Sequence, residues 1–104
     1  SEAMHEIALD LAEGADSIII KPGMPYLDIL SQAKQKFEVP CITYQVSGEY
    51  SMLCAAFESG YLDRERTILE TLLCFKRAGA NAIFTYFAPE VAKILSKTEN
   101  STLK

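Results

Sequence analysis

GADSIIIKPG, residues 14–23, is the stretch that decides the fold. Gly14 ends the amphipathic helical pattern of residues 3–13, because glycine readily adopts the left-handed conformation that closes a helix. The run at 17–20, a serine followed by three β-branched isoleucines, is too short for a helix and apolar at successive isoleucine positions, which is typical of a parallel strand covered on both faces. Pro22 and Gly23 then predict a turn. The stretch therefore predicts a helix followed by a buried parallel strand.

The same helix-to-strand pattern occurs twice more along the chain. GANAI at 79–83 follows a helical pattern and opens a strand at 82–87, and a helix opened by Pro25 leads to a strand at 41–46. Three consecutive helix–strand units predict an α/β fold with parallel strands and right-handed crossovers. Both an open doubly wound sheet and a segment of a (β/α)8 barrel fit this pattern.

The remaining elements complete one domain at 1–96 and a polar tail at 97–104. They are a helix at 49–59 stopped by Gly60, a helix at 64–78 capped by Asp63 and stopped by Gly79, and a last helix from 89 to 95. Three short parallel strands would leave unpaired N–H and C=O groups on both edges. We therefore expect an incomplete barrel that needs further strands.

The composition excludes several classes of protein. With 49% hydrophobic and 23% charged residues among 104, the chain is globular rather than disordered. A net charge of −4 leaves no basic patch for nucleic acid or an anionic membrane surface, and no apolar run approaches the roughly 20 residues of a membrane span. The N-terminus has no signal-peptide pattern, and three cysteines without CxxC spacing predict core residues in a reducing, cytoplasmic compartment.

Reactive side chains follow the strands at their carboxyl ends, where α/β folds bind ligands. Lys21 follows the isoleucine run, and exclusion of its amine from water would favour the neutral form that attacks carbonyl groups to give a Schiff base. The alternative is a lysine that extends into solvent from a strand end.

The second and third strands bring hydroxyl groups to the same edge. Ser47 is either a helix N-cap or a ligand for a substrate carboxylate, while Tyr44 and Tyr86 are either core aromatics or hydrogen-bond donors at the rim. Glu49, like Asp28, is expected to be a solvated helix residue.

Four stretches, in this order over about residues 3–95, resemble the porphobilinogen synthase (5-aminolevulinate dehydratase) family. They are IKPGMPYLDI at 20–29, YQVSGEY at 44–50, FKRAGA at 75–80 and TYFA at 85–88. Several multi-residue motifs at matching separations are far more specific than any one of them. The family folds as a (β/α)8 barrel, and the resemblance covers its carboxy-terminal three units.

The resemblance implies roles for individual residues. Lys21 would form the Schiff base with 5-aminolevulinate, Ser47 and Tyr86 would bind a substrate carboxylate, and Tyr44 would line the pocket. Glu6 matches a glutamate that holds an allosteric magnesium ion through water in magnesium-responsive members. The parent enzyme uses magnesium, zinc or both and no organic cofactor, and the ligands of its catalytic metal lie outside this chain.

The implied reaction is the condensation of two 5-aminolevulinate molecules to porphobilinogen by a lyase of haem biosynthesis. The family suggests self-association into octamers. Parts of the family's active site, including a second lysine, are missing here, so we expect the isolated chain to be a fragment with little or no activity. Two alternatives stay open: another Schiff-base barrel enzyme of the class I aldolase type, and a non-catalytic module that assembles with a full-length partner.

Overall fold

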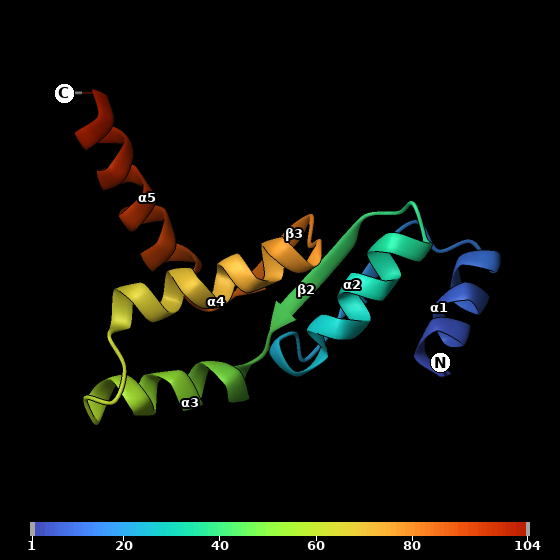
Figure 1. Ribbon diagram of the computed structural model, residues 1–104, viewed down its shortest axis with the longest axis horizontal. Helices are drawn as coiled ribbons and strands as arrows, with labels where there is room; N and C mark the ends of the chain where they lie inside the picture. The colour runs from blue at the N-terminus through green and yellow to red at the C-terminus, as the bar shows by residue number, and fades with distance from the viewer. Residues whose placement is uncertain (1, 104) are drawn as a thin grey trace.

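The structure is a computed structural model that describes residues 2–103, and the side chains of residues 2–97. It has the predicted α/β architecture of parallel strands and helices (Figure 1). The elements in order are α1 (Glu2–Ala12), β1 (Ile18–Ile20), the 3₁₀ helix η1 (Met24–Tyr26), α2 (Leu27–Lys36), β2 (Cys41–Gln45), α3 (Ser47–Glu58), α4 (Arg64–Ala78), β3 (Ala82–Thr85) and α5 (Ala88–Leu103).

The predicted helix boundaries are confirmed where a residue has a clear capping role. Gly14 and Gly79 have φ angles of +108° and +113°, the left-handed conformation that ends a helix. The side chain of Asp63 accepts a hydrogen bond from the Arg66 backbone N–H at 2.9 Å and caps α4 as predicted.

Several boundaries differ from the sequence prediction: β3, expected at 82–87, ends at Thr85, and the helix expected at 49–59 begins at Ser47. Pro25 lies in η1, so the continuous α-helix begins only at Leu27. The polar tail predicted at 97–104 is helical as far as Leu103, because no proline or glycine interrupts α5 there. Residue 104 lies outside the described part of the chain. Among the described residues no helix combines the length and the hydropathy that a membrane crossing requires.

The sheet fits a barrel segment, one of the two architectures that the sequence left open. The strands are parallel and lie in the order β1-β2-β3, with Ile18 opposite Cys41 and Ile42 opposite Ala82. Figure 1 shows α1, α2 and α4 arranged along the sheet, while α3 and α5 extend away from it. Sequential strand order is the arrangement of a barrel, and one half of a doubly wound sheet, up to its switch point, shares it.

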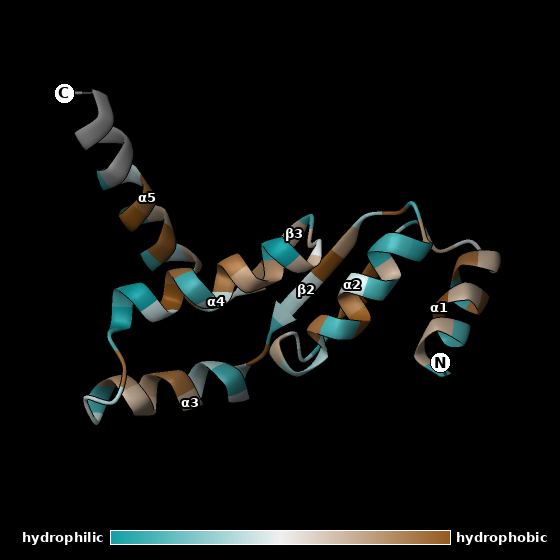
Figure 2. Cartoon of the chain, in the orientation of Figure 1, coloured by the Kyte–Doolittle hydropathy of each residue, from teal (hydrophilic) through white to brown (hydrophobic). Residues whose placement is uncertain are grey.

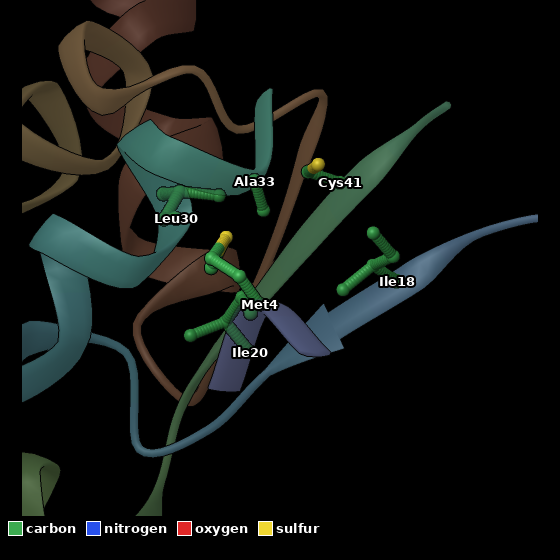
Figure 3. Packing of buried hydrophobic residues seen from close by; sticks show 6 residues of the cluster. All are labelled: Met4, Ile18, Ile20, Leu30, Ala33 and Cys41. Atoms are coloured by element: carbon green, nitrogen blue, oxygen red, sulfur yellow. The ribbon is translucent and has the colours of Figure 1, made fainter. Parts of the chain in front are cut away.

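The hydrophobic core lies between this sheet and the helices α1 and α2. Figure 3 shows its six buried side chains: Met4, Ile18, Ile20, Leu30, Ala33 and Cys41. Leu30, Ala33 and Cys41 have no exposed surface. The core therefore fixes β1 and β2 against the helices on one face only.

The other face of the sheet is open, which corrects the prediction that β1 is covered on both faces. Ile19 is 54% exposed and Phe84 on β3 is 52% exposed. Successive side chains of a strand point to opposite faces, so the isoleucine run divides between core and open face. In the described part of the chain no element packs over this face.

Candidate functional site

The carboxyl ends of the three strands form the rim where the sequence placed its candidate residues. Tyr44 pairs with Phe84 and Gln45 with Thr85, so β2 and β3 end at the same level of the sheet. Figure 2 shows β2 changing from hydrophobic at its start to hydrophilic at its arrowhead. The polar groups of the sheet thus gather at the rim, where a parallel sheet binds ligands.

The structure brings the two candidate tyrosines together at this rim. The hydroxyl groups of Tyr44 and Tyr86 lie 3.4 Å apart, and their ring centroids are separated by 6.5 Å. Both residues line an open cleft of about 310 Å³. The hydrogen bond with Tyr86 is the main cause that raises the pKa of Tyr44 above its ordinary value, and the electrostatic effect of Tyr86 is the second. Tyr44 therefore stays protonated and can donate a hydrogen bond to a carboxylate.

Lys21 lies at the end of β1 but is exposed, so the predicted exclusion of its amine from water is wrong for this chain. The side chain lines a separate hollow, together with Glu6, Asp10 and Tyr26. Ile19, two residues before Lys21 and therefore on the same side of the strand, is on the open face of the sheet. The physical reason is that this open face leaves the strand end in contact with water.

Ser47 is the first residue of α3 and is exposed. The N-cap position is occupied by Val46, and the backbone N–H of Val46 donates to a carboxylate oxygen of Glu49 at 3.3 Å. The interpretation of Ser47 as an N-cap is therefore wrong, because the Glu49 side chain performs the capping. Among the described residues no hydrogen bond of the Ser47 hydroxyl is found, and the structure shows no contact of Lys21 or Ser47 with the tyrosine pair.

A buried polar network below the rim was missed by the sequence analysis. Glu49, expected to be solvated, is only 4% exposed, and Gln45 has no exposed surface. The Thr85 hydroxyl donates to the Gln45 side-chain oxygen at 2.5 Å and accepts the backbone N–H of Phe87 at 3.1 Å. The capping-box signal requires Ser or Thr three residues before the glutamate, and Val46 stands there, so the sequence gives no such signal for Glu49. Nothing in the sequence places Gln45 opposite Thr85, because that pairing is set by strand register.

The candidate magnesium ligand lies on the outer edge of this region. Glu6 is exposed on α1, and Asp10 follows it by one helical turn. Among the described residues no group of three potential metal-ligating side chains occurs. Magnesium commonly keeps most of its water and contacts one or two carboxylates, so Glu6 fits such an ion only as a ligand acting through water.

The cysteines lie apart from the site and from one another. Cys41 is buried on β2, whereas Cys54 and Cys74 are half-buried on α3 and α4. All three are free thiols, and burial raises the pKa of the Cys41 thiol. The prediction of core residues therefore holds fully for Cys41 and only in part for the other two.

Comparisons with known proteins agree on one family. The sequence profile described as "Delta-aminolevulinic acid dehydratase" matches residues 1–94. The delta-aminolevulinic acid dehydratase of Rhodobacter capsulatus is 52% identical over 95 residues, which is 91% of this chain and 29% of that protein. The protein of the same name from Streptomyces coelicolor is 55% identical over 94 residues, which is 90% of this chain and 28% of that protein.

A solved structure is similar over nearly the whole chain. It is the delta-aminolevulinic acid dehydratase (porphobilinogen synthase) of Toxoplasma gondii ME49 in complex with the reaction product porphobilinogen. The TM-score is 0.93 at 48% sequence identity, covering 99% of this chain and 29% of that one. The chain thus spans less than a third of the length of these relatives.

Proposed function

Because the chain belongs to the delta-aminolevulinic acid dehydratase family, we propose that it forms the carboxy-terminal part of a porphobilinogen synthase. This lyase condenses two molecules of 5-aminolevulinate to porphobilinogen in haem biosynthesis. The observation that carries the proposal is the family match over residues 1–94, which includes every candidate site residue. The product-bound relative from Toxoplasma gondii supports the same substrate class.

In this proposal Lys21 supplies the covalent chemistry. Its neutral amine attacks the ketone carbon of 5-aminolevulinate, and loss of one water molecule leaves a C=N bond to the lysine. Protonation of that nitrogen gives an iminium ion, which makes the neighbouring C–H more acidic. The chemistry requires the open face near Lys21 to be covered when the enzyme works, since a desolvated amine is the better nucleophile.

The hydroxyl groups at the rim orient the substrate. Ser47 and Tyr86 donate to the substrate carboxylate, and Tyr44 holds the Tyr86 hydroxyl at 3.4 Å while lining the same cleft. Fixing the carboxylate aligns the ketone with the amine and lowers the entropic part of the barrier. The exposed hydroxyl of Ser47 at the start of α3 supports this role, because the backbone N–H groups of a helix start also favour an anion.

Metal and assembly complete the proposal. Magnesium or zinc would act as a Lewis acid in the complete enzyme, and Glu6 would hold an allosteric magnesium ion through water. The catalysis uses no organic cofactor because the amine of Lys21 provides the electrophilic intermediate. We place the enzyme in the cytoplasm as a homo-oligomer; the free cysteines support the reducing compartment, and the open sheet face supports further assembly.

The open sheet face also favours a second candidate, a non-catalytic module that assembles with a full-length partner. Ile19 and Phe84 on that face are more than half exposed. The class I aldolase alternative is not favoured by the family match.

A chimaeric enzyme tests the proposal. This chain replaces the matched 29% of the Rhodobacter capsulatus relative, and the product is assayed for porphobilinogen formation from 5-aminolevulinate. We expect turnover that Lys21→Met abolishes and Lys34→Met retains, because the Lys34 amine donates to Asn81 at 2.8 Å, outside the rim. The isolated chain should show little or no turnover.

Borohydride trapping separates the candidates in the same chimaera. We expect 5-aminolevulinate, and no sugar phosphate, to add mass to the peptide that contains Lys21. An adduct with sugar phosphate alone would favour the aldolase. Association with the relative in the absence of any Lys21 adduct would favour the assembly module.

A further inference from the structure

Glu49 is a buried carboxylate that the proposed reaction does not use. It lies in the first turn of α3, yet it is only 4% exposed. Burial of a carboxylate is costly unless hydrogen bonds compensate it. Its partners in the described part of the chain are two backbone N–H groups, those of Met24 at 3.1 Å and Val46 at 3.3 Å.

These two N–H groups belong to the two segments that carry site residues. Met24 begins η1 in the turn that follows Lys21, and Val46 directly precedes Ser47. Each carboxylate oxygen accepts one of them, Oε2 that of Met24 and Oε1 that of Val46. One side chain therefore links the turn after β1 to the start of α3. Met24 and Glu49 are 25 residues apart in the sequence.

Other contacts hold the same turn against the sheet. The backbone N–H of Gly23 donates to the carbonyl oxygen of Tyr44 at 2.9 Å. A Cβ atom at Gly23 would lie 2.6 Å from a ring carbon of Phe75 on α4, so the turn is tightly packed on that side. The Gln45 side-chain NH₂ lies 3.7 Å from the Met24 sulfur, and the Glu49 carboxylate adds the bond to the Met24 backbone N–H.

We propose that Glu49 is a positioning residue that sets the separation between Lys21 and Ser47. The inference rests on the proposed roles of Lys21 and Ser47. A carboxylate suits the task because it has two acceptor oxygens and no donor. Glutamine at this position has one acceptor oxygen, and its NH₂ group would face the second backbone N–H, so only one of the two segments could be held.

Amide hydrogen exchange in the full chain tests the link without any reaction. We expect Glu49→Ala to accelerate exchange at Met24 and Val46 by about tenfold or more, and Glu49→Gln to accelerate exchange at one of the two. The control is Glu58→Gln, an exposed glutamate of the same helix. Unchanged protection in α4 shows that the fold is intact, and unchanged exchange at both amides in both Glu49 variants would overturn the proposal.

The chemistry at Lys21 distinguishes positioning from a merely structural role. In the chimaera with the Rhodobacter capsulatus relative, borohydride trapping of 5-aminolevulinate needs Lys21 and Ser47 in register, whereas reductive methylation by formaldehyde needs only an accessible amine. We expect Glu49→Gln to slow trapping about tenfold while methylation of Lys21 stays within twofold of wild type. Glu58→Gln should change neither rate.

Each outcome has a defined meaning. Faster exchange with an unchanged trapping-to-methylation ratio overturns the positioning role. A chimaera that 5-aminolevulinate does not modify at Lys21 contradicts the proposed function and the positioning role that rests on it. The exchange rates then still decide whether Glu49 links the two segments.

Discussion

At the scale of single residues, the contact between Tyr44 and Tyr86 shows how the fold changes the chemistry of ordinary side chains. The two residues are 42 positions apart, yet their hydroxyl groups lie 3.4 Å from each other. Tyr50 also packs against Tyr86, with their ring centroids 5.3 Å apart. Tyr86 therefore has two aromatic neighbours while half of its surface stays exposed.

The first prediction concerns the titration of Tyr44. Because the hydrogen bond with Tyr86 is the main cause that raises the pKa of Tyr44, Tyr86→Phe should lower that pKa toward the ordinary value near 10. Ultraviolet absorbance or NMR of labelled tyrosine measures the shift. Tyr61→Phe, at a site that is 83% exposed, is the control and should leave the Tyr44 titration in place. An unmoved Tyr44 titration in Tyr86→Phe would contradict the hydrogen bond.

At the scale of elements, strand pairing places polar side chains where helix and strand patterns alone do not predict them. The β2–β3 register sets Gln45 opposite Thr85, and the Thr85 hydroxyl continues to the backbone N–H of Phe87. This chain of hydrogen bonds ties the end of β2 to the turn that carries Tyr86. Two residues before Gln45 on β2, the buried Thr43 hydroxyl has no hydrogen-bond partner among the described residues.

The two threonines give a matched pair of substitutions. Thr85→Val removes the hydroxyl that bonds the Gln45 side-chain oxygen and the Phe87 N–H, so we expect a loss of about 1–3 kcal/mol in the free energy of unfolding. Thr43→Val removes a hydroxyl that has no hydrogen-bond partner among the described residues, so it should leave the free energy of unfolding unchanged or raise it. Denaturant unfolding measures both. Equal effects of the two substitutions would show that the Thr85 hydrogen bonds contribute nothing.

The contact between α4 and α5 depends on a charge pair. Arg64 donates two hydrogen bonds to Glu90, at 2.8 and 2.9 Å, and its guanidinium lies 5.3 Å from the ring centroid of Phe57. The bond to Arg64 lowers the pKa of Glu90 below its ordinary value. The stabilisation is therefore present above the ordinary glutamate pKa and is lost as the pH falls through the lowered value.

A pH series tests this pair. Glu90→Gln should lower the free energy of unfolding at pH 7 by less than about 1 kcal/mol, because the two side chains are 35% and 47% exposed. The difference from wild type should begin to shrink below the ordinary glutamate pKa of about 4.3 and disappear once the pH is below the lowered pKa of Glu90. Glu70→Gln, an exposed residue of α4, serves as the control. A difference that persists at low pH would show that the pair does not act through charge.

At the scale of the whole molecule, the chain is flat rather than compact. Its radius of gyration is 15.7 Å and its extents are 47 × 35 × 17 Å, whereas a compact domain of this length has a radius of gyration of about 13 Å. The shortest extent corresponds to one sheet and one layer of helices. The open face carries exposed apolar side chains, which soluble monomers rarely expose in a contiguous patch.

We expect the isolated chain to self-associate through that face. The double substitution Ile19→Lys with Phe84→Lys should shift the chain toward monomer, because it puts two charges on the face. Analytical ultracentrifugation at several concentrations measures the shift. Tyr61→Lys changes an exposed aromatic residue between α3 and α4 and should leave association unchanged. A wild-type chain that is monomeric at every concentration would contradict the prediction.

The sequence by itself determined the alternation of helices and strands, their parallel direction and the family. Glycines at helix ends, β-branched runs and the motifs around Lys21, Ser47 and Tyr86 are local signals, and local backbone preferences act between near neighbours in the chain. The tertiary structure decided the rest: the sequential strand order, the open face that leaves Ile19 and Lys21 exposed, and the burial of Glu49. These features depend on which distant segments meet, and a carboxylate such as Glu49 becomes buried only when the turn after β1 and the start of α3 both present N–H groups to it.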